Sequence, residues 1–271
     1  MKKLPECLLF FLLLFCGHGN IVSSEPAVGS DRPPAASEQL LVAAFTKTFN
    51  NPDEFKASGI FQLLGYNDSE ISQIGKITPR PSRIRVETVT DSGIGRFASL
   101  KVFCEKVFYY NLTIERVVFN FPDCVIDETQ LQNGRLRFVA GKQIELTTEV
   151  SADDILKVFE LYAQARSLSS MNMKLASNSA RLRGRIKKGI VTADFSLQGT
   201  TQLLDPKTIF FRCERLLLNG MPMPRNAVAA IFKQINPVFD ASKTWLNLNV
   251  ARVCIKPGFV ETQATINHKK G

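Results

Sequence analysis

Apolar residues recur at helical spacing in three stretches of the chain, and each stretch is followed by runs in which apolar and polar residues alternate. Spacing of three and four residues places side chains on one face of a helix, whereas alternation places them on one face of a strand. Connections between consecutive strands are short, which favours antiparallel pairing. The predicted class is therefore α+β: a curved, mostly antiparallel β-sheet packed on about three α-helices.

Each predicted helix combines a start signal with an apolar face. The first begins at Ser37 as its N-cap, and the second begins at Ser151, which forms a capping-box-like pair with Asp154. The third has Pro224 in its first turn, where the missing N–H leaves no helical hydrogen bond unmade. The apolar faces comprise Leu40, Leu41, Ala44, Phe45 and Thr48 in the first helix, Ile155, Phe159 and Tyr162 in the second, and Val228, Ile231, Phe232 and Ile235 in the third. Residues 61–77 have no clear period.

The predicted strands are short, β-branched and aromatic, and polar or glycine-containing turns separate them, which is typical of antiparallel meanders. Before the second helix they are "RIRVETV", "RFASLKVFCEKVFYYN", "TIERVVFNF", "CVIDET", "GRLRFVAG" and "QIELTTEV". After it they are "MKLASNSARLRGRI", "IVTADFSLQGTT", "TIFFRCERLLLNG", "TWLNLNVARVCI" and "FVETQATI".

The beginning of the chain indicates export. A basic "MKK" precedes "CLLFFLLLF", an apolar core of about nine residues that is typical of a secretory signal and short for a membrane span. We expect a signal peptide at 1–24 with cleavage after Ser24, a flexible tether at 25–36, and one domain at 37–268. A second interpretation takes "LLFCG" as a bacterial lipobox that ends in lipidation of Cys16. Both place the protein in the periplasm or on the cell surface.

Charge narrows the choice of partner. The chain carries a net charge of +9 and has a pI of about 9.3, which favours an anionic partner. Because the protein is expected outside the cytoplasm, an anionic membrane surface is favoured over nucleic acid. Basic residues alternate with apolar ones along three runs, at Arg83 and Arg85, at Arg135 and Arg137, and at Arg181, Arg183, Arg185 and Lys187. If these runs share a sheet, one of its faces is basic; it is either a solvated outer face or a surface that holds phosphate.

Four cysteines lie outside the leader: Cys104, Cys124, Cys213 and Cys254. An even number in an exported protein predicts two disulfides, with Cys104–Cys124 and Cys213–Cys254 as the preferred pairing. The alternative is that some of them are free buried thiols that behave as small apolar groups.

Catalytic chemistry is sparse. The only histidines are His18, in the leader or the tether, and His268, near the C-terminus. Hydrolase, nucleotide-binding and metalloprotease motifs are missing from the sequence. Asp153 and Asp154 open a helix, where capping explains them better than acid–base catalysis does. We therefore expect a protein that is not an enzyme and has no metal or cofactor.

The aromatic residues suggest a binding groove. The chain has 20 Phe, one Trp and four Tyr, and most of the Phe residues are expected in the core. A curved sheet packed on apolar helices can also leave an apolar groove that holds an acyl chain. The residues expected to line such a groove are Ile155, Phe159, Tyr162, Phe195, Val228, Ile231 and Phe232.

Several stretches, taken in order, resemble the LmeA-like phospholipid-binding family of exported bacterial proteins. They are "IGKI" at 74–77, "VSADDILKVFE" at 150–160, "LLLNGMPMPRNAVAAIFKQINP" at 216–237, and a late strand before Pro-Gly and the final strand. The resemblance implies phospholipid binding in the cell envelope without catalysis. The basic runs would then hold the headgroup phosphate, since arginine can hold two phosphate oxygens at once.

Two other functions fit the same sequence. An envelope scaffold protein could use its β surface to bind another protein or a polysaccharide. An enzyme acting on glycolipid would need two carboxylates facing one cleft.

The basic run at 180–189 generates a test. Changing Arg181, Arg183 and Arg185 together to Gln should leave folding intact, because exposed charges contribute little to stability. The same change should weaken cosedimentation with anionic liposomes if these residues hold phosphate. Unchanged binding would identify the run as a solvated face.

Overall fold

A computed structural model describes residues 36–74, 78–90, 95–109, 112–163, 168–188, 190–243 and 247–269. The predicted signal peptide and all of the predicted tether except Ala36 lie outside these residues. The described chain divides into two compact units. The C-terminal unit contains Thr147–Thr265 and the described part of Tyr110–Glu115; the N-terminal unit contains Arg116–Leu146 and the described parts of Gly19–Tyr109 and Ile266–Gly271. The single domain expected at 37–268 thus comprises two units, and each is described by itself.

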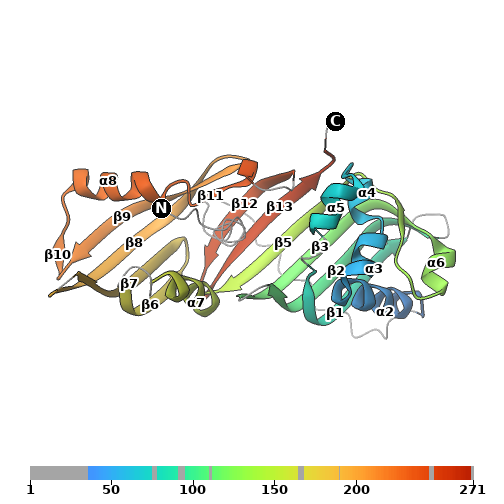
Figure 1. Cartoon of the computed structure of the whole chain (residues 1–271), viewed down its shortest axis with the longest axis horizontal. Coiled ribbons are helices and arrows are strands. Elements are labelled where there is room, and N and C mark those ends of the chain that lie inside the picture. The colour runs from blue at the N-terminus through green and yellow to red at the C-terminus, as the bar shows by residue number, and fades with distance from the viewer. Residues whose placement is uncertain are drawn as a thin grey trace. The chain divides into compact units, whose positions relative to one another are not determined.

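Two antiparallel sheets, one of them curled into a half-barrel, and a few helices make up the fold, so the class is α+β with β-structure predominating (Figure 1). The seven-stranded sheet has the order β1-β2-β3-β5-β13-β12, with β4 paired to β3. The six-stranded sheet has the order β10-β9-β8-β7-β6, with β11 paired to β9. The expectation of one sheet was wrong, because β6 to β9 each pair with the next strand along the chain and so form a sheet of their own.

The strands of the first sheet are β1 (Arg80–Thr90), β2 (Arg96–Tyr109), β3 (Leu112–Ile126), β4 (Phe138–Ala140), β5 (Gln143–Ser151), β12 (Leu248–Lys256) and β13 (Phe259–Asn267). Those of the second are β6 (Leu168–Ala176), β7 (Ser179–Lys188), β8 (Val191–Asp205), β9 (Thr208–Leu218), β10 (Met221–Pro222) and β11 (Phe239–Asp240). The helices are α2 (Ala36–Asn50), α3 (Pro52–Ala57), α4 (Ile60–Leu63), α5 (Asp68–Ile74), α6 (Glu128–Gln132), α7 (Ala152–Ala163), α8 (Arg225–Ile235) and the 3₁₀ helix η2 (Ala241–Lys243).

Helix α2 packs on β1 and supplies the core of the N-terminal unit. Its buried positions follow the helical period: Leu41, Ala44, Phe45, Thr48 and Phe49. Two details differ from the prediction. Leu40 is 43% exposed, and the helix begins one residue before Ser37, so that this residue lies in the first turn rather than at the cap.

Phenylalanine rings fill this core in a continuous cluster. The ring centroids of Phe121 and Phe138 lie 4.8 Å apart, and Phe45 meets Phe49 edge-on at 5.4 Å. The short helices α3 and α4 extend the cluster through Phe55 and Phe61, whose centroids lie 5.3 Å apart. Most phenylalanines of this unit are therefore core residues, as the sequence suggested.

Two predicted strands of the N-terminal unit have different bounds. "TIERVVFNF" and the first half of "CVIDET" form one strand, β3, in which Asp123 takes a positive φ of 48°. The second half of "CVIDET" is not strand, because Asp127 is the N-cap of α6 and the next two residues begin that helix. The run "GRLRFVAG" pairs only over β4. Residues 135–137 instead follow the turn after α6, where the backbone N–H of Arg135 donates to the carbonyl of Gln130 at 2.9 Å.

The N-terminus of α7 confirms the predicted capping pair. Ser151 Oγ accepts from the backbone N–H of Asp154 at 3.1 Å and donates to its carboxylate at 2.7 Å. Lys157 Nζ lies 2.7 Å from the same carboxylate, and this hydrogen bond raises the pKa of the lysine. Capping thus accounts for the acidic start of this helix.

Replacing Ser151 by Ala should remove the cap and destabilise the protein by about 1 kcal/mol. Denaturant unfolding followed by circular dichroism measures this change. Ser72→Ala serves as the matched control, because this exposed hydroxyl in α5 bonds only to the carbonyl of Ser69 three residues earlier. Equal stability of the two variants would show that the cap contributes nothing.

All four cysteines of the described chain are free thiols, which differs from the predicted disulfides. Cys213 lies on β9 and Cys254 on β12, so the two residues belong to different sheets. Cys104 and Cys124 are buried, and burial raises the pKa of each thiol to about 12. The alternative interpretation, free buried thiols, describes this structure.

Alkylation with mass spectrometry tests this state. Without reductant, all four cysteines should be alkylated once the protein is unfolded. In the folded protein Cys104 and Cys124 should resist, because a thiol with a raised pKa stays protonated and these two are also buried. Cys213, which is half-buried, should react before them. Disulfide-linked peptides would contradict the free-thiol state.

Candidate functional site

The predicted basic residues do not form one shared face. Arg83 and Arg85 lie on β1 and residues 135–137 precede β4, all in the N-terminal unit, whereas the run from Arg181 to Lys187 lies on β7 in the C-terminal unit. The idea of one common basic face was therefore wrong. A period of two tells which residues share a face of one strand, but not which strands are neighbours.

The basic residues of β1 have local partners. Arg83 Nη1 lies 3.9 Å from Glu105 Oε2 on β2. The Arg85 guanidinium forms an ion pair with Glu87 and lies 4.1 Å from the centroid of the Phe103 ring. These contacts satisfy much of the charge on β1, so this strand is a weaker candidate for binding an anion.

Register places the basic run of β7 on one face of the six-stranded sheet. Arg181, Arg183, Arg185 and Lys187 lie opposite Gln198, Ser196, Asp194 and Thr192 of β8. Two of these pairs are hydrogen-bonded: Arg181 Nη2 donates to Gln198 Oε1 at 2.8 Å, and Arg185 Nε donates to Asp194 Oδ1 at 2.9 Å. The bond to Asp194 raises the pKa of Arg185.

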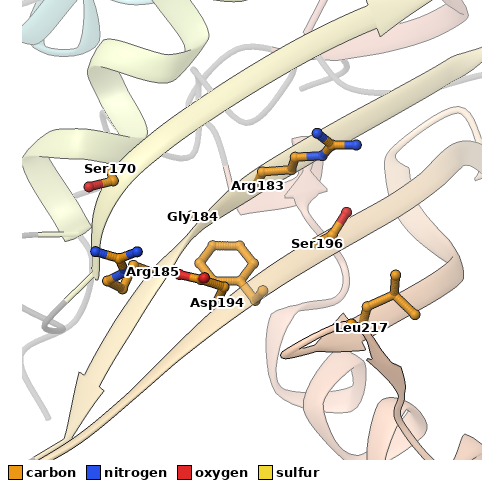
Figure 2. Close-up of a pocket in the computed structure, with 9 residues that line it drawn as sticks. Ser170, Arg183, Gly184, Arg185, Asp194, Ser196 and Leu217 are labelled. Atoms are coloured by element: carbon orange, nitrogen blue, oxygen red, sulfur yellow. Dashed lines mark hydrogen bonds and ion pairs between the residues drawn. The ribbon is translucent and has the colours of Figure 1, made fainter.

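A shallow hollow of about 350 Å³ lies on this part of the sheet, lined by residues of β6, β7, β8 and β9 and by Gly220 (Figure 2). Figure 2 shows the Arg185 guanidinium beside the Asp194 carboxylate, while the Arg183 guanidinium extends away from both. A Cβ at Gly184 would lie 2.8 Å from the Phe195 ring, so glycine at this position leaves room for the ring where it lies. The hollow offers one arginine, Arg183, that has no ion pair among the described residues.

A second and larger cavity lies between β9 and α8, with a volume of about 710 Å³. We call it the β9–α8 groove. Its lining divides by chemistry into the arginines Arg212, Arg215 and Arg225, the acidic Glu214, and the apolar or small residues Cys213, Leu216, Pro222, Met223, Val228, Ala229 and Phe232.

Hydrogen bonds join the segments at both ends of α8 to β9, so the helix and the strand form the two sides of the groove. Before the helix, the backbone N–H of Met223 donates to the carbonyl of Leu216 at 2.9 Å. After it, the Asn236 side chain accepts from the backbone N–H of Phe211 at 2.9 Å and donates to its carbonyl at 3.0 Å. Between these points the Phe232 ring stacks on Phe211, with centroids 5.6 Å apart.

The electrostatics of the β9–α8 groove favour an anion. Arg212, Arg215 and Arg225 are all exposed and form no ion pair among the described residues, whereas Glu214 is the single acidic residue in the lining. Burial raises the pKa of the Cys213 thiol, so this cysteine stays neutral. Among the described lining residues there is no histidine and no pair of carboxylates, so the groove suits binding better than acid–base catalysis.

The predicted apolar-groove residues fall in three places. Val228 and Phe232 line the β9–α8 groove, and Phe195 lines the smaller hollow. Ile155 is buried and Phe159 half-buried on α7, which packs on β6, and Ile231 is 38% exposed on α8. The side chain of Tyr162 lies outside the described residues.

Sequence reasoning missed the three groove arginines. Arg212 and Arg215 flank Cys213 and Glu214, where the pairing of β8 with β9 shifts register between Gln198 and Gly199, so they do not alternate with apolar residues. Arg225 stands at the first position of α8 rather than on a strand. The sequence does place these arginines in "RCER" and "MPMPR", on either side of one turn, and this could have suggested that they lie close together.

Comparisons of the chain with protein families, with curated proteins and with solved structures each found no match. The resemblance inferred from the sequence stays a prediction. Among the described residues, no helix is long and apolar enough to cross a membrane, and no group of three or more His, Cys, Asp or Glu side chains could hold a metal ion.

Proposed function

We propose that this protein binds an anionic phospholipid in the β9–α8 groove. One observation carries the proposal: three arginines without ion-pair partners among the described residues and an apolar wall line the same cavity. An amphipathic anion is the class of ligand that satisfies both halves of such a cavity. The volume of about 710 Å³ lies in the range of small-molecule sites.

The two halves of the ligand have separate roles. Acyl chain lies against Leu216, Met223, Val228 and Phe232, where it removes apolar surface from water. Headgroup phosphate lies at the guanidinium groups of Arg212, Arg215 and Arg225, whose planar donor arrays match phosphate oxygens. Glu214 lies in the same lining and disfavours a second negative charge, which favours a phosphodiester over a doubly charged phosphomonoester.

The proposed function agrees with the location in the cell envelope that the leader predicts. An exported protein with a net charge of +9 meets anionic lipid at the surface of the cell envelope. Binding of this kind requires neither catalysis nor a metal.

The triple variant Arg212→Gln, Arg215→Gln, Arg225→Gln tests the site. Isothermal titration with a short-chain phosphatidylglycerol, kept monomeric, should show binding at least about tenfold weaker than wild type, because each arginine loses a charge-assisted hydrogen bond. The matched control is Arg83→Gln, Arg135→Gln, Arg137→Gln, which removes the same charge from the N-terminal unit and should bind as wild type does.

Two further arms separate the sources of phosphate. Glycerophosphoglycerol, which has the same phosphodiester headgroup but no acyl chain, should bind far more weakly than the short-chain lipid. Lipid extracted from the purified protein should be identified as a phospholipid by mass spectrometry. Equal losses of affinity in the two triple variants would show that net charge, rather than the groove, determines binding. A wild type that binds neither monomeric lipid nor vesicles would overturn the proposal.

A further inference from the structure

Exposed apolar side chains gather at one end of the six-stranded sheet. Ile190 in the β7–β8 turn is fully exposed, and Met221 on β10 is 69% exposed. Ile186 on β7 and Leu218 on β9 are each more than a third exposed. Single exposed apolar residues are ordinary, but a cluster at one end of a unit indicates an interaction surface.

Register shows that these residues belong together. Ile186 lies opposite Ala193 near the start of β8, and Phe195 two residues later lies opposite Leu218 at the end of β9. Leu218 in turn lies opposite Met221 on β10. The β7–β8 and β9–β10 turns therefore lie at the same end of the sheet, and Figure 1 shows both turns there. We call this end, with Ile186, Ile190, Leu218 and Met221, the apolar tip.

The β9–β10 turn is held rigidly. Asn219 and Gly220 both take positive φ values, 48° and 78°, as the central residues of a tight two-residue hairpin turn do. The backbone N–H of Asn219 donates to the carbonyl of Asp194 at 2.7 Å, and its side-chain oxygen accepts from the backbone N–H of Asp194 at 2.8 Å. Leu218 and Met221 are thus presented to solvent by a fixed scaffold rather than by a loose loop.

Several basic side chains lie near the apolar tip in the sequence and in the sheet. Lys187 is exposed beside Ile186 and has no ion pair among the described residues, and Arg225 opens α8 directly after β10. Arg183 and Arg185 lie with Lys187 on the face of β7 opposite to Ile186; Asp194, the acidic residue there, is already paired with Arg185. Apolar side chains flanked by unpaired positive charge complement the surface of an anionic bilayer.

We propose that the apolar tip docks on an anionic bilayer, inserting Met221 and Ile190 at the level of the headgroups while the neighbouring basic residues contact lipid phosphate. This inference rests on the proposed function for its biological sense, since it explains how lipid would reach the groove. Met221 continues directly into Pro222 and Met223, which line the β9–α8 groove. The docked tip therefore places the beginning of the groove wall next to the bilayer.

Matched substitutions at the two ends of the six-stranded sheet test the docking. Met221→Glu should weaken cosedimentation with vesicles of phosphatidylcholine and phosphatidylglycerol by about tenfold, because burial of the methionine side chain is lost and a negative charge meets anionic lipid. Leu204→Glu makes the same kind of change at the opposite end of β8, at a side chain that is 56% exposed, and should bind as wild type does. Equal binding by the two variants would overturn the docking proposal.

A gain of signal provides a second measurement. Vesicles that contain brominated lipid should quench the tryptophan fluorescence of Met221→Trp. Quenching of Leu204→Trp should not exceed that of the native tryptophan at position 245. Absence of extra quenching at Met221→Trp would show that the tip does not insert into the bilayer. A wild-type oligomer that Met221→Glu dissociates would show instead that the tip binds a second copy of this chain.

The two proposals fail separately. Met221 does not line the groove, so Met221→Glu should leave the affinity for monomeric short-chain phosphatidylglycerol unchanged. If Met221→Glu loses vesicle binding and the wild type does not bind monomeric lipid, the result would support docking and reject the groove. Binding of monomeric lipid with unchanged vesicle binding by Met221→Glu would support the groove and reject docking.

Discussion

The register of β8 against its two neighbours is the constraint on which the surfaces of the C-terminal unit depend. Pairing with β7 places four basic residues on one face and Leu182, Gly184 and Ile186 on the other. Pairing with β9 aligns the β9–β10 turn with the β7–β8 turn at one end of the sheet. A shift of one residue would move every side chain to the opposite face, so this register determines both the basic face and the apolar tip.

Helix α8 turns the surface of β9 into a groove because it is attached at both ends. The Met223 to Leu216 hydrogen bond fixes its start, and the Asn236 side chain takes both backbone groups of Phe211 at its end. A polar side chain that pairs with an edge-strand backbone holds the helix without filling the space between. The helix packs on β9 through the Phe211–Phe232 stack, and the cavity between the two elements is lined by the three arginines and the apolar wall.

The β9–α8 groove and the apolar tip both place accessible apolar side chains close to positive charge. Exposed methionine and isoleucine side chains at one end of a sheet are typical of a surface that a partner covers. In the N-terminal unit the core phenylalanines pack on one another, and Arg83 and Arg85 of β1 meet Glu105, Glu87 and Phe103. Its exposed apolar side chains, among them Val89, Phe108 and Val139, do not line the cavity that carries the proposal. Binding is therefore proposed for the C-terminal unit alone.

The sequence by itself determined the local features: the α7 capping pair, most of the buried face of α2, and the alternation of Arg181, Arg183 and Arg185, because a helix or a strand sets side-chain direction from its own backbone period. Only the tertiary structure decided which strands are neighbours, that the described residues form two sheets, that the four cysteines are free thiols, and that Arg212, Arg215 and Arg225 line one cavity with an apolar wall. Strand partners and register follow from contacts between distant residues, and a bulge next to Gly199 breaks the period that would have revealed two of these arginines.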